Sequence, residues 1–224
     1  MVNNTTEHNS QQSLVFDKTV TKRVTCNYLL FLPEGYGKTE KHWPLILYLH
    51  GYGQRGDDLE QIKVNGLAGK IETDKSLPFV IVSPQCPENR EWWSDDVVIN
   101  LLDHIIANYD IDERRVYLTG LSMGGFETWR LACEYPDRFA AIAPICGGGE
   151  PLATESIKDI PIWAFHGAND DVVPLIRSIE MVDAVNKFGG DAKLTIYPGA
   201  HHESWEQTYA NEELYEWFLK HSRK

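Results

Sequence analysis

Short apolar runs alternate with amphipathic stretches along most of this chain, a pattern that predicts strands alternating with helices. The run Leu45–Leu49 is apolar throughout, as expected of a strand that is covered on both faces of a sheet. The stretch Asp95–Asn108 instead repeats its apolar residues at helical spacing. The same patterns predict further strands at Leu14–Phe16, Val24–Leu32, Pro78–Ser83, Val116–Leu118, Phe139–Cys146, Pro161–Phe165 and Ala192–Tyr197, and further helices at Gly124–Tyr135, Leu175–Phe188 and Ser204–His221.

This alternation, after an antiparallel-looking start, predicts one α/β domain over residues 13–224. Its sheet is expected to be mostly parallel, with helices on both faces. Residues 1–12 are polar and predict a disordered lead-in. Ser204 and Gln207 are spaced as a capping box at the start of the last helix.

The composition argues against two classes of binding partner and does not decide the cellular location of the protein. A hydrophobic fraction of 42% supports a sizeable core, and a net charge of −12 argues against nucleic acid and anionic membrane surfaces. No apolar run approaches a membrane span, and the polar N-terminal stretch is not a secretion signal. A cytoplasmic protein and a secreted one with its signal already removed both fit, and the oligomeric state is undetermined. The four cysteines lack metal-ligand or disulfide-scaffold spacing and are predicted to be reduced core residues.

A G-x-S-x-G motif, Gly120, Ser122 and Gly124, lies between a predicted strand and a predicted helix. A tight turn there strains the central residue and lifts its side chain clear of the sheet, and flanking glycines avoid collisions. The helix start behind Ser122 offers free N–H groups to a developing oxyanion. The motif therefore predicts a nucleophilic serine, provided that the chain also supplies a base and an acid, because plain Gly/Ser turns match it too.

Candidate partners for Ser122 follow the last two predicted strands. Asp170 and Asp171 come after the first of these strands, and His201 and His202 come after the second. The carboxyl ends of parallel strands share one edge of a sheet, and Ser, Asp and His follow in the chain order of an α/β-hydrolase triad. Imidazole, with an ordinary pKa of about 6.5, suits removal of the serine proton, and a buried carboxylate would orient it.

Three segments carry a resemblance to a known family: Tyr109–Gly125, His166–Pro174 (HGANDDVVP) and Tyr197–Trp205 (YPGAHHESW). They resemble the α/β-hydrolase serine esterases of the phospholipase/carboxylesterase group, related to polyhydroxyalkanoate-depolymerase-like and feruloyl-esterase-like enzymes. The likeness extends from about Pro33 to the C-terminus. It implies an α/β-hydrolase fold and a carboxylic ester hydrolase that works through an acyl-enzyme, with no cofactor. The sequence shows no cluster of metal ligands, and whether a metal ion is needed stays open.

The same resemblance selects between the paired candidates. The family's acid falls on Asp170, with Asp171 as the alternative. The family's base falls on His202, and the adjacent His201 is a departure from the family pattern that keeps it as the alternative.

The oxyanion hole needs two backbone donors. One is predicted to be the amide of Met123, the residue after the nucleophile. By resemblance to the family's H-G-x-G turn, the other is the amide of Tyr52, with His50 bracing the loop. The same loop also reads as a G-x-G-x-x-G dinucleotide fingerprint (Gly51, Gly53, Gly56), which we disfavour because two adjacent carboxylates behind it would repel a pyrophosphate.

The stretch between Cys146 and Pro161 is too short for a cap domain, which predicts an open site for small or polymer-linked esters. Trp92, Trp93 and Trp205 are candidates for an aromatic wall, although each serves equally well as core filling. The predicted function is hydrolysis of short-to-medium acyl or aryl esters, including feruloyl and sugar-linked esters. The alternatives are an acyl-thioesterase or lysophospholipase of the same mechanism and, from another class, a non-catalytic binding protein of this fold.

Overall fold

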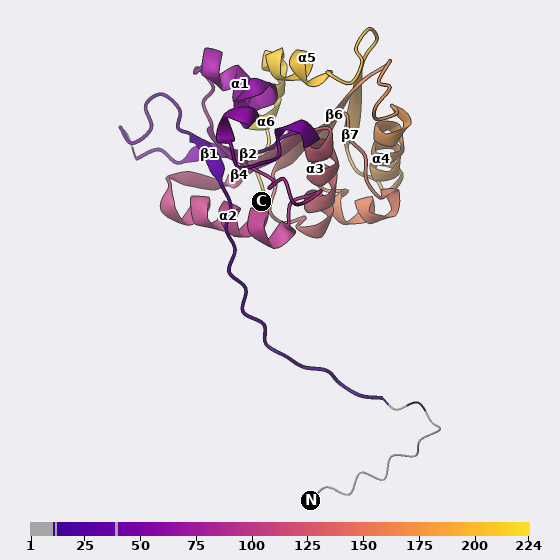
Figure 1. The fold of residues 1–224 in the computed structure, drawn as a ribbon. Helices are drawn as coiled ribbons and strands as arrows, with labels where there is room; N and C mark the ends of the chain where they lie inside the picture. The colour runs from indigo at the N-terminus through magenta and orange to yellow at the C-terminus, as the bar shows by residue number, and fades with distance from the viewer. Residues whose placement is uncertain (1–10, 12, 39) are drawn as a thin grey trace, which may run out of the picture.

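The computed structural model describes residues 11, 13–38 and 40–224. Seven strands form one sheet in the order β1-β3-β2-β4-β5-β6-β7 (Figure 1). They are β1 (Tyr28–Phe31), β2 (Trp43–Leu49), β3 (Val80–Pro84), β4 (Ile111–Leu121), β5 (Ala141–Ile145), β6 (Ile162–Gly167) and β7 (Ala192–Tyr197). Only the pair of β1 and β3 is antiparallel, so the predicted α/β class with a mostly parallel sheet is confirmed.

Helices cover both faces of this sheet, as predicted. One buried core contains side chains of α2, α3 and α4, and the other contains side chains of α1, α5 and α6 (Figure 1). The helices are α1 (Gly66–Thr73), α2 (Asp95–Asn108), α3 (Met123–Glu134), α4 (Ile176–Lys187), α5 (Trp205–Ala210) and α6 (Glu212–Leu219), with short 3₁₀ segments η1 (Tyr52–Gln54), η2 (Leu59–Val64) and η3 (Pro151–Ile157). Among the described residues, no helix combines the length and the apolarity that crossing a membrane requires.

Strand β2 is buried on both of its faces, which accounts for the unbroken apolar run Leu45–Leu49. Leu45 and Leu47 belong to the core beneath α2–α4, whereas Ile46 and Tyr48 belong to the core beneath α1, α5 and α6. Successive side chains of a strand point to opposite faces, so both sets of positions must be apolar. All four side chains are fully buried.

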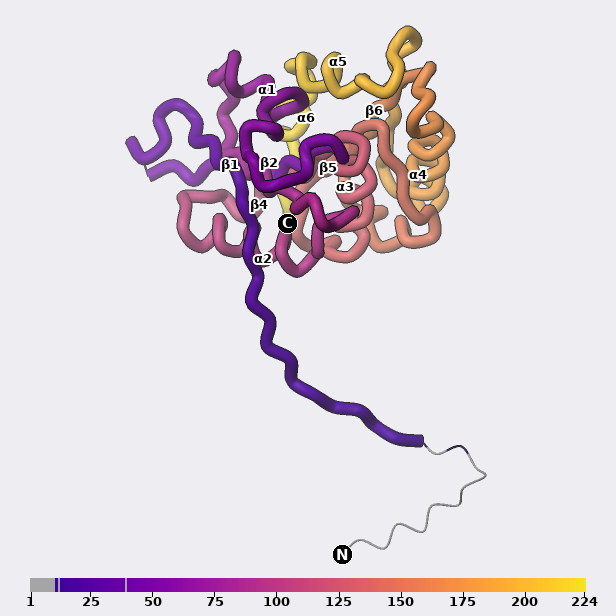
Figure 2. Tube along the Cα trace, in the orientation of Figure 1, coloured from indigo at the N-terminus to yellow at the C-terminus, as the bar shows by residue number. Residues whose placement is uncertain are grey.

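The predicted first strand, Leu14–Phe16, is wrong. These residues pair with no strand, and Leu14, Val15 and Phe16 are 83%, 95% and 88% exposed. Figure 2 shows this part of the chain running away from the sheet. The second predicted strand, Val24–Leu32, is shorter than expected and forms β1, which pairs with β3. The disordered lead-in predicted for residues 1–12 lies, apart from residue 11, outside the described residues.

The predicted last helix, Ser204–His221, is also wrong, because it is two helices with Asn211 between α5 and α6. The Asn211 side chain accepts a hydrogen bond from the N–H of Glu213 and so caps α6, as Asn commonly does at a helix start. The expected capping box is absent: Ser204 already has helical backbone angles (φ −55°, ψ −18°), and its side chain makes no capping hydrogen bond. The other predicted strands and helices are confirmed to within about two residues at their ends, except that β4 begins at Ile111 and ends at Leu121, well outside the predicted Val116–Leu118.

Candidate active site

Ser122 occupies a strained turn between β4 and α3. Its backbone angles are φ 53° and ψ −117°, in a region that non-glycine residues seldom adopt. A Cβ on Gly120 would lie 2.4 Å from the carbonyl oxygen of Gly124, and one on Gly124 would lie 2.1 Å from that of Leu49. The two glycines of the motif are therefore required by close backbone contacts on both sides of the serine.

The predicted serine, histidine and aspartate lie in one chain of hydrogen bonds. Ser122 Oγ is 2.9 Å from His202 Nε2, and His202 Nδ1 is 2.8 Å from Asp170 Oδ2. Because a carboxylate only accepts, Nδ1 carries the proton and Nε2 is free to accept the serine hydroxyl. The Asp170 side chain is fully buried and the His202 side chain is 17% exposed, so this proton path is largely shielded from water.

The neighbouring candidates, Asp171 and His201, take no part in these hydrogen bonds. Asp171 and His201 are both exposed, whereas Asp170 and His202 point toward Ser122. The second oxygen of Asp170, Oδ1, accepts the backbone N–H groups of Val172 and Val173 at 3.0 and 2.8 Å. The geometry thus brings together the pair that the family pattern selects.

Two backbone amides stand where an oxyanion hole is expected. Met123 is the first residue of α3 and Tyr52 is the first residue of η1, and N–H groups at these positions lack an acceptor within their own helix. Both residues adjoin the nucleophile or line the cavity at its side chain.

His50 holds the loop that carries Tyr52. Its Nδ1–H donates to the carbonyl oxygen of Gly51 (2.7 Å), and its Nε2 accepts the N–H of Cys86 (3.0 Å). Burial lowers the pKa of His50 to about 4, so the ring is neutral and keeps this one tautomer. The bracing role expected for His50 agrees with these contacts.

The predicted aromatic wall divides between two cavities. One, of about 350 Å³, is lined by residues that include Tyr52, Ser122, His202 and Trp205. The ring of Trp205 meets that of His202 edge to face, with the centroids 5.3 Å apart. The first cavity is therefore the one next to the nucleophile.

Trp92 and Trp93 line the other cavity, of about 560 Å³, which has neither Ser122 nor His202 among its lining residues. Trp92 is 44% exposed, but Trp93 is only 4% exposed. The ring of Trp93 packs against that of His50, with the centroids 4.6 Å apart. Trp93 thus supports the loop of His50 and offers little surface to a substrate.

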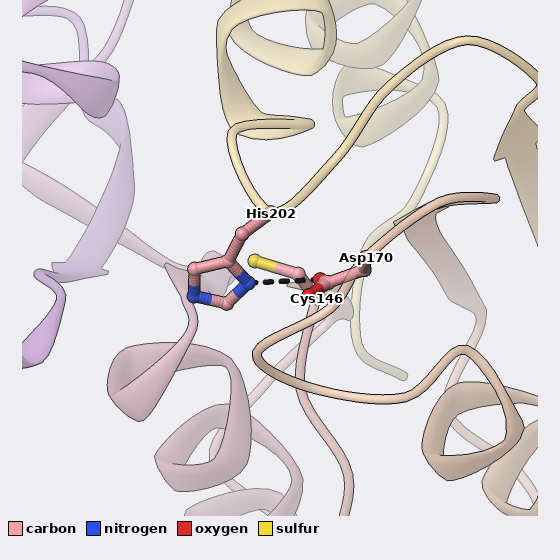
Figure 3. Close-up of side chains that lie close together, drawn as sticks. All are labelled: Cys146, Asp170 and His202. Carbon is pink, nitrogen blue, oxygen red and sulfur yellow. Dashed lines mark hydrogen bonds and ion pairs between the residues drawn. The ribbon is translucent and has the colours of Figure 1, made fainter.

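Cys146, predicted only as a core residue, lies beside the nucleophile. Its Sγ accepts the N–H of Ser122 at 3.3 Å, and Figure 3 shows its side chain next to those of Asp170 and His202. One ligand atom from each of these three residues lies within 4.8 Å of the others, a spacing that a metal ion can bridge. The chemistry is unfavourable, however, because burial raises the pKa of the thiol to about 12 and a metal would displace the hydrogen bond between His202 and Asp170.

Sequence reasoning also missed His166, whose ring lies 3.2 Å from Asp170 Oδ2. The available signal was its place at the carboxyl end of β6, where the site was already expected. Cys146 carried the same signal, since it directly follows β5.

The sheet, the strained turn at Ser122 and the hydrogen-bonded side chains at the carboxyl ends of the strands define a protein of the α/β-hydrolase class. Residues 89–215 match the phospholipase/carboxylesterase family model, and the chain belongs to this family. The resemblance inferred from the sequence motifs is thereby confirmed.

The names of several similar proteins fit this family. The chain is 33% identical over 137 residues to the bifunctional acetylxylan esterase/xylanase XynS20E of Neocallimastix patriciarum, covering 58% of this chain and 20% of the relative. It is 34% identical over 127 residues to poly(3-hydroxyalkanoate) depolymerase C of Paucimonas lemoignei, covering 50% of this chain and 29% of the relative. Further relatives carry feruloyl esterase in their names.

Among solved structures, a thermostable esterase superposes with a TM-score of 0.76 and 36% identity, covering 88% of this chain and 59% of that one. In the comparison with the acetylxylan esterase/xylanase and the depolymerase, this chain spans less than a third of the length of each relative. The family and the esterases among these relatives support a carboxylic ester hydrolase.

Proposed function

We propose that this chain is a serine carboxylesterase, in which one domain over residues 13–224 hydrolyses carboxylic esters through a covalent acyl-enzyme. The observation that carries the proposal is the pair of hydrogen bonds from Ser122 Oγ to His202 Nε2 (2.9 Å) and from His202 Nδ1 to Asp170 Oδ2 (2.8 Å). A serine hydroxyl is a weak nucleophile on its own, and a base within hydrogen-bond distance activates it.

In the first half of the reaction, Ser122 Oγ bonds to the ester carbonyl carbon while the hydroxyl proton moves to His202 Nε2. The carbonyl oxygen becomes an oxyanion, which the amides of Met123 and Tyr52 stabilise. Asp170 stabilises the imidazolium. His202 then gives its proton to the alcohol oxygen, the bond between carbon and that oxygen breaks, and the acyl group stays on Ser122.

In the second half, a water oxygen attacks the acyl carbon while His202 Nε2 takes one of the water protons. The bond from the acyl carbon to Ser122 Oγ then breaks, and His202 returns the proton to that oxygen. The products are the carboxylic acid and the original serine hydroxyl, so the enzyme is regenerated with no other co-reactant than water.

The surroundings of Ser122 support short-to-medium acyl and aryl esters as substrates. The adjoining cavity of about 350 Å³ is small, and its residues include the indole of Trp205 and the exposed ring of Tyr52. The stretch between Cys146 and Pro161 carries only the short segment η3, so no cap domain is inserted there. An uncapped site accepts an ester that projects from a polymer as well as a small one, which fits the names of the acetylxylan esterase and the depolymerase among the relatives.

Labelling with a fluorophosphonate tests the proposal, because such reagents trap activated serines. The wild-type chain should incorporate one label per active site, and peptide mapping should locate it on Ser122. Ser122→Ala should remain unlabelled, whereas Ser156→Ala, a matched change at an exposed serine, should label like wild type. An unlabelled wild-type chain would instead favour a non-catalytic binding protein.

A substrate panel separates the remaining alternatives. p-Nitrophenyl esters from acetate to palmitate and methyl ferulate would be compared with an acyl-thioester and a lysophospholipid. The proposal expects the highest kcat/KM among the short-to-medium or aryl oxygen esters. A clear preference for the thioester or the lysophospholipid would reassign the substrate class while leaving the mechanism intact.

A further inference from the structure

The buried carboxylate of Asp170 has a second imidazole beside it. His166 Nε2 lies 3.2 Å from Asp170 Oδ2, the same oxygen that accepts the hydrogen bond from His202. The side chains of His166 and Asp170 are both fully buried, so water does not screen this contact. Two imidazoles, those of His166 and His202, therefore share one oxygen of the acid of the candidate triad.

Hydrogen bonds fix the orientation of the His166 ring. Its Nε2 is 2.8 Å from the carbonyl oxygen of Val173, and both this oxygen and Asp170 Oδ2 are acceptors only. Nε2 must therefore carry a proton. Nδ1 lies 2.7 Å from Ser178 Oγ, and the carbonyl oxygen of Gly147 is a second partner of that hydroxyl at 3.0 Å. The Ser178 hydroxyl thus contacts both the ring and the backbone after β5, and it holds the ring from the Nδ1 side.

His166 and Val173 together contact both carboxylate oxygens of Asp170. His166 Nε2–H donates to the carbonyl oxygen of Val173, and the N–H of Val173 donates to Asp170 Oδ1 at 2.8 Å. The same Nε2–H presents its positive edge to Asp170 Oδ2. Both oxygens of Asp170 are thus held, one through Val173 and the other next to the ring itself.

We propose that His166 is a positioning residue for the reaction, which holds the Asp170 carboxylate where it orients His202. The proposal rests on the proposed esterase function. His166 touches neither Ser122 nor the cavity beside it, so it acts only through Asp170. A loose carboxylate would let the His202 ring turn away from the serine, which lowers kcat and leaves substrate binding unaffected.

The test compares His166→Leu with His166→Gln in the full chain, with p-nitrophenyl acetate as substrate. Gln offers an N–H near the position of Nε2, whereas Leu offers none. We expect the Leu variant to lose about 10-fold to 100-fold in kcat with KM unchanged, by analogy with the loss of the hydrogen-bond partners that orient metal ligands. The Gln variant should recover most of that loss, and His104→Asn, at an exposed histidine on α2, should match wild type.

A double-mutant cycle with Asp170→Asn shows whether His166 works through Asp170. If it does, His166→Leu should cost little further activity once the carboxylate is gone. An equal loss in both backgrounds, an equal loss in the Leu and Gln variants, or full kcat in the Leu variant would each overturn the proposal. Dependence of wild-type activity on Ser122 is measured in parallel, so a failure of the esterase assignment is seen separately.

Ser178→Ala supplies a second perturbation if the Leu variant does not fold. It removes the hydroxyl that contacts Nδ1 and so holds the ring in place. We expect a several-fold fall in kcat with KM unchanged, and this fall should vanish in the Asp170→Asn background. An unchanged kcat in Ser178→Ala, or a fall that persists without the carboxylate, would overturn the proposal.

Discussion

The closest approach of α3 to β2 makes Gly124 the most restrictive position of the nucleophile turn. In Gly124→Ala the new Cβ would lie 2.1 Å from the carbonyl oxygen of Leu49, 2.5 Å from its carbonyl carbon and 2.8 Å from the carbonyl oxygen of His50. All three are backbone atoms, so no side-chain rotation relieves the overlap. The turn, the strand or both must move.

The size of this movement follows from ordinary contact distances. Ordinary contacts between carbon and carbonyl oxygen begin at about 3.3 Å, so the two backbones must separate by about 1.2 Å to reach one. A displacement of about 1 Å at reacting groups costs about 100-fold in rate. Overpacking of this kind also destabilises a fold by about 1–3 kcal/mol, and we expect the upper end because only backbone can yield.

Two measurements on Gly124→Ala check this reasoning: kcat with p-nitrophenyl acetate and the midpoint of urea unfolding. Gly199→Ala is the matched control, because a Cβ there meets nothing within 4 Å and its φ is not in the left-handed region. The control should match wild type in both measurements. A Gly124→Ala protein with wild-type kcat and wild-type stability would refute the claim that this close approach positions Ser122.

Three further predictions concern the paired candidates and the loop of His50. His202→Ala should lower kcat by about 10⁶-fold, as loss of a triad histidine does in a serine protease, whereas His201→Ala should stay near wild type. Asp170→Asn should lower kcat by about 10⁴-fold and Asp171→Asn should not; equal losses within either pair would contradict the geometry. Since the pKa of His50 is lowered to about 4, its contribution to stability is present above the ordinary value of about 6.5 and is lost as the pH falls toward 4. That loss amounts to about 1.4 kcal/mol per pH unit, so His50→Gln should show a flatter fall in urea stability between these values, and parallel curves would contradict the assignment.

The sequence predicts which loops meet at the candidate site better than it predicts the elements at the two chain ends, for a physical reason. Apolar runs give the strands, and parallel strands place their carboxyl ends at one edge whatever their register. The loops with Ser122, Asp170 and His202 therefore had to converge, and chain order suggested their roles. The conformation of each loop decides between Asp170 and Asp171 and between His202 and His201, and the sequence pattern does not give it. The family resemblance supplied the choice, and the hydrogen-bond geometry supports it.

Two elements were wrong because local pattern does not report tertiary partners. Leu14–Phe16 has the composition of a strand but pairs with no other strand. The apolar spacing of the last helix continues through Asn211, so periodicity alone misses the break that the Asn211 side chain stabilises. Ser204 fails as a cap because its own backbone angles are already helical.

The sequence alone could not predict close contacts between side chains that lie far apart along the chain. Cys146 lies against the amide of Ser122, and Trp93 lies behind His50, only because separate strand ends meet at the site. Residue type alone indicated core filling for the cysteine and left core and site equally open for the tryptophan. His166 was visible as part of a motif, but its contact with Asp170 appears only once the loop after β6 folds back on the ring.

Hydrolysis of p-nitrophenyl acetate by wild type and by Ser122→Ala, purified and assayed in parallel, decides whether Ser122 is the nucleophile. We expect wild type to turn over the ester and the variant to lose about 10⁶-fold in kcat, as a serine protease does without its nucleophile. Hydrolysis that persists in Ser122→Ala, or is absent from a folded wild-type chain, would contradict this expectation.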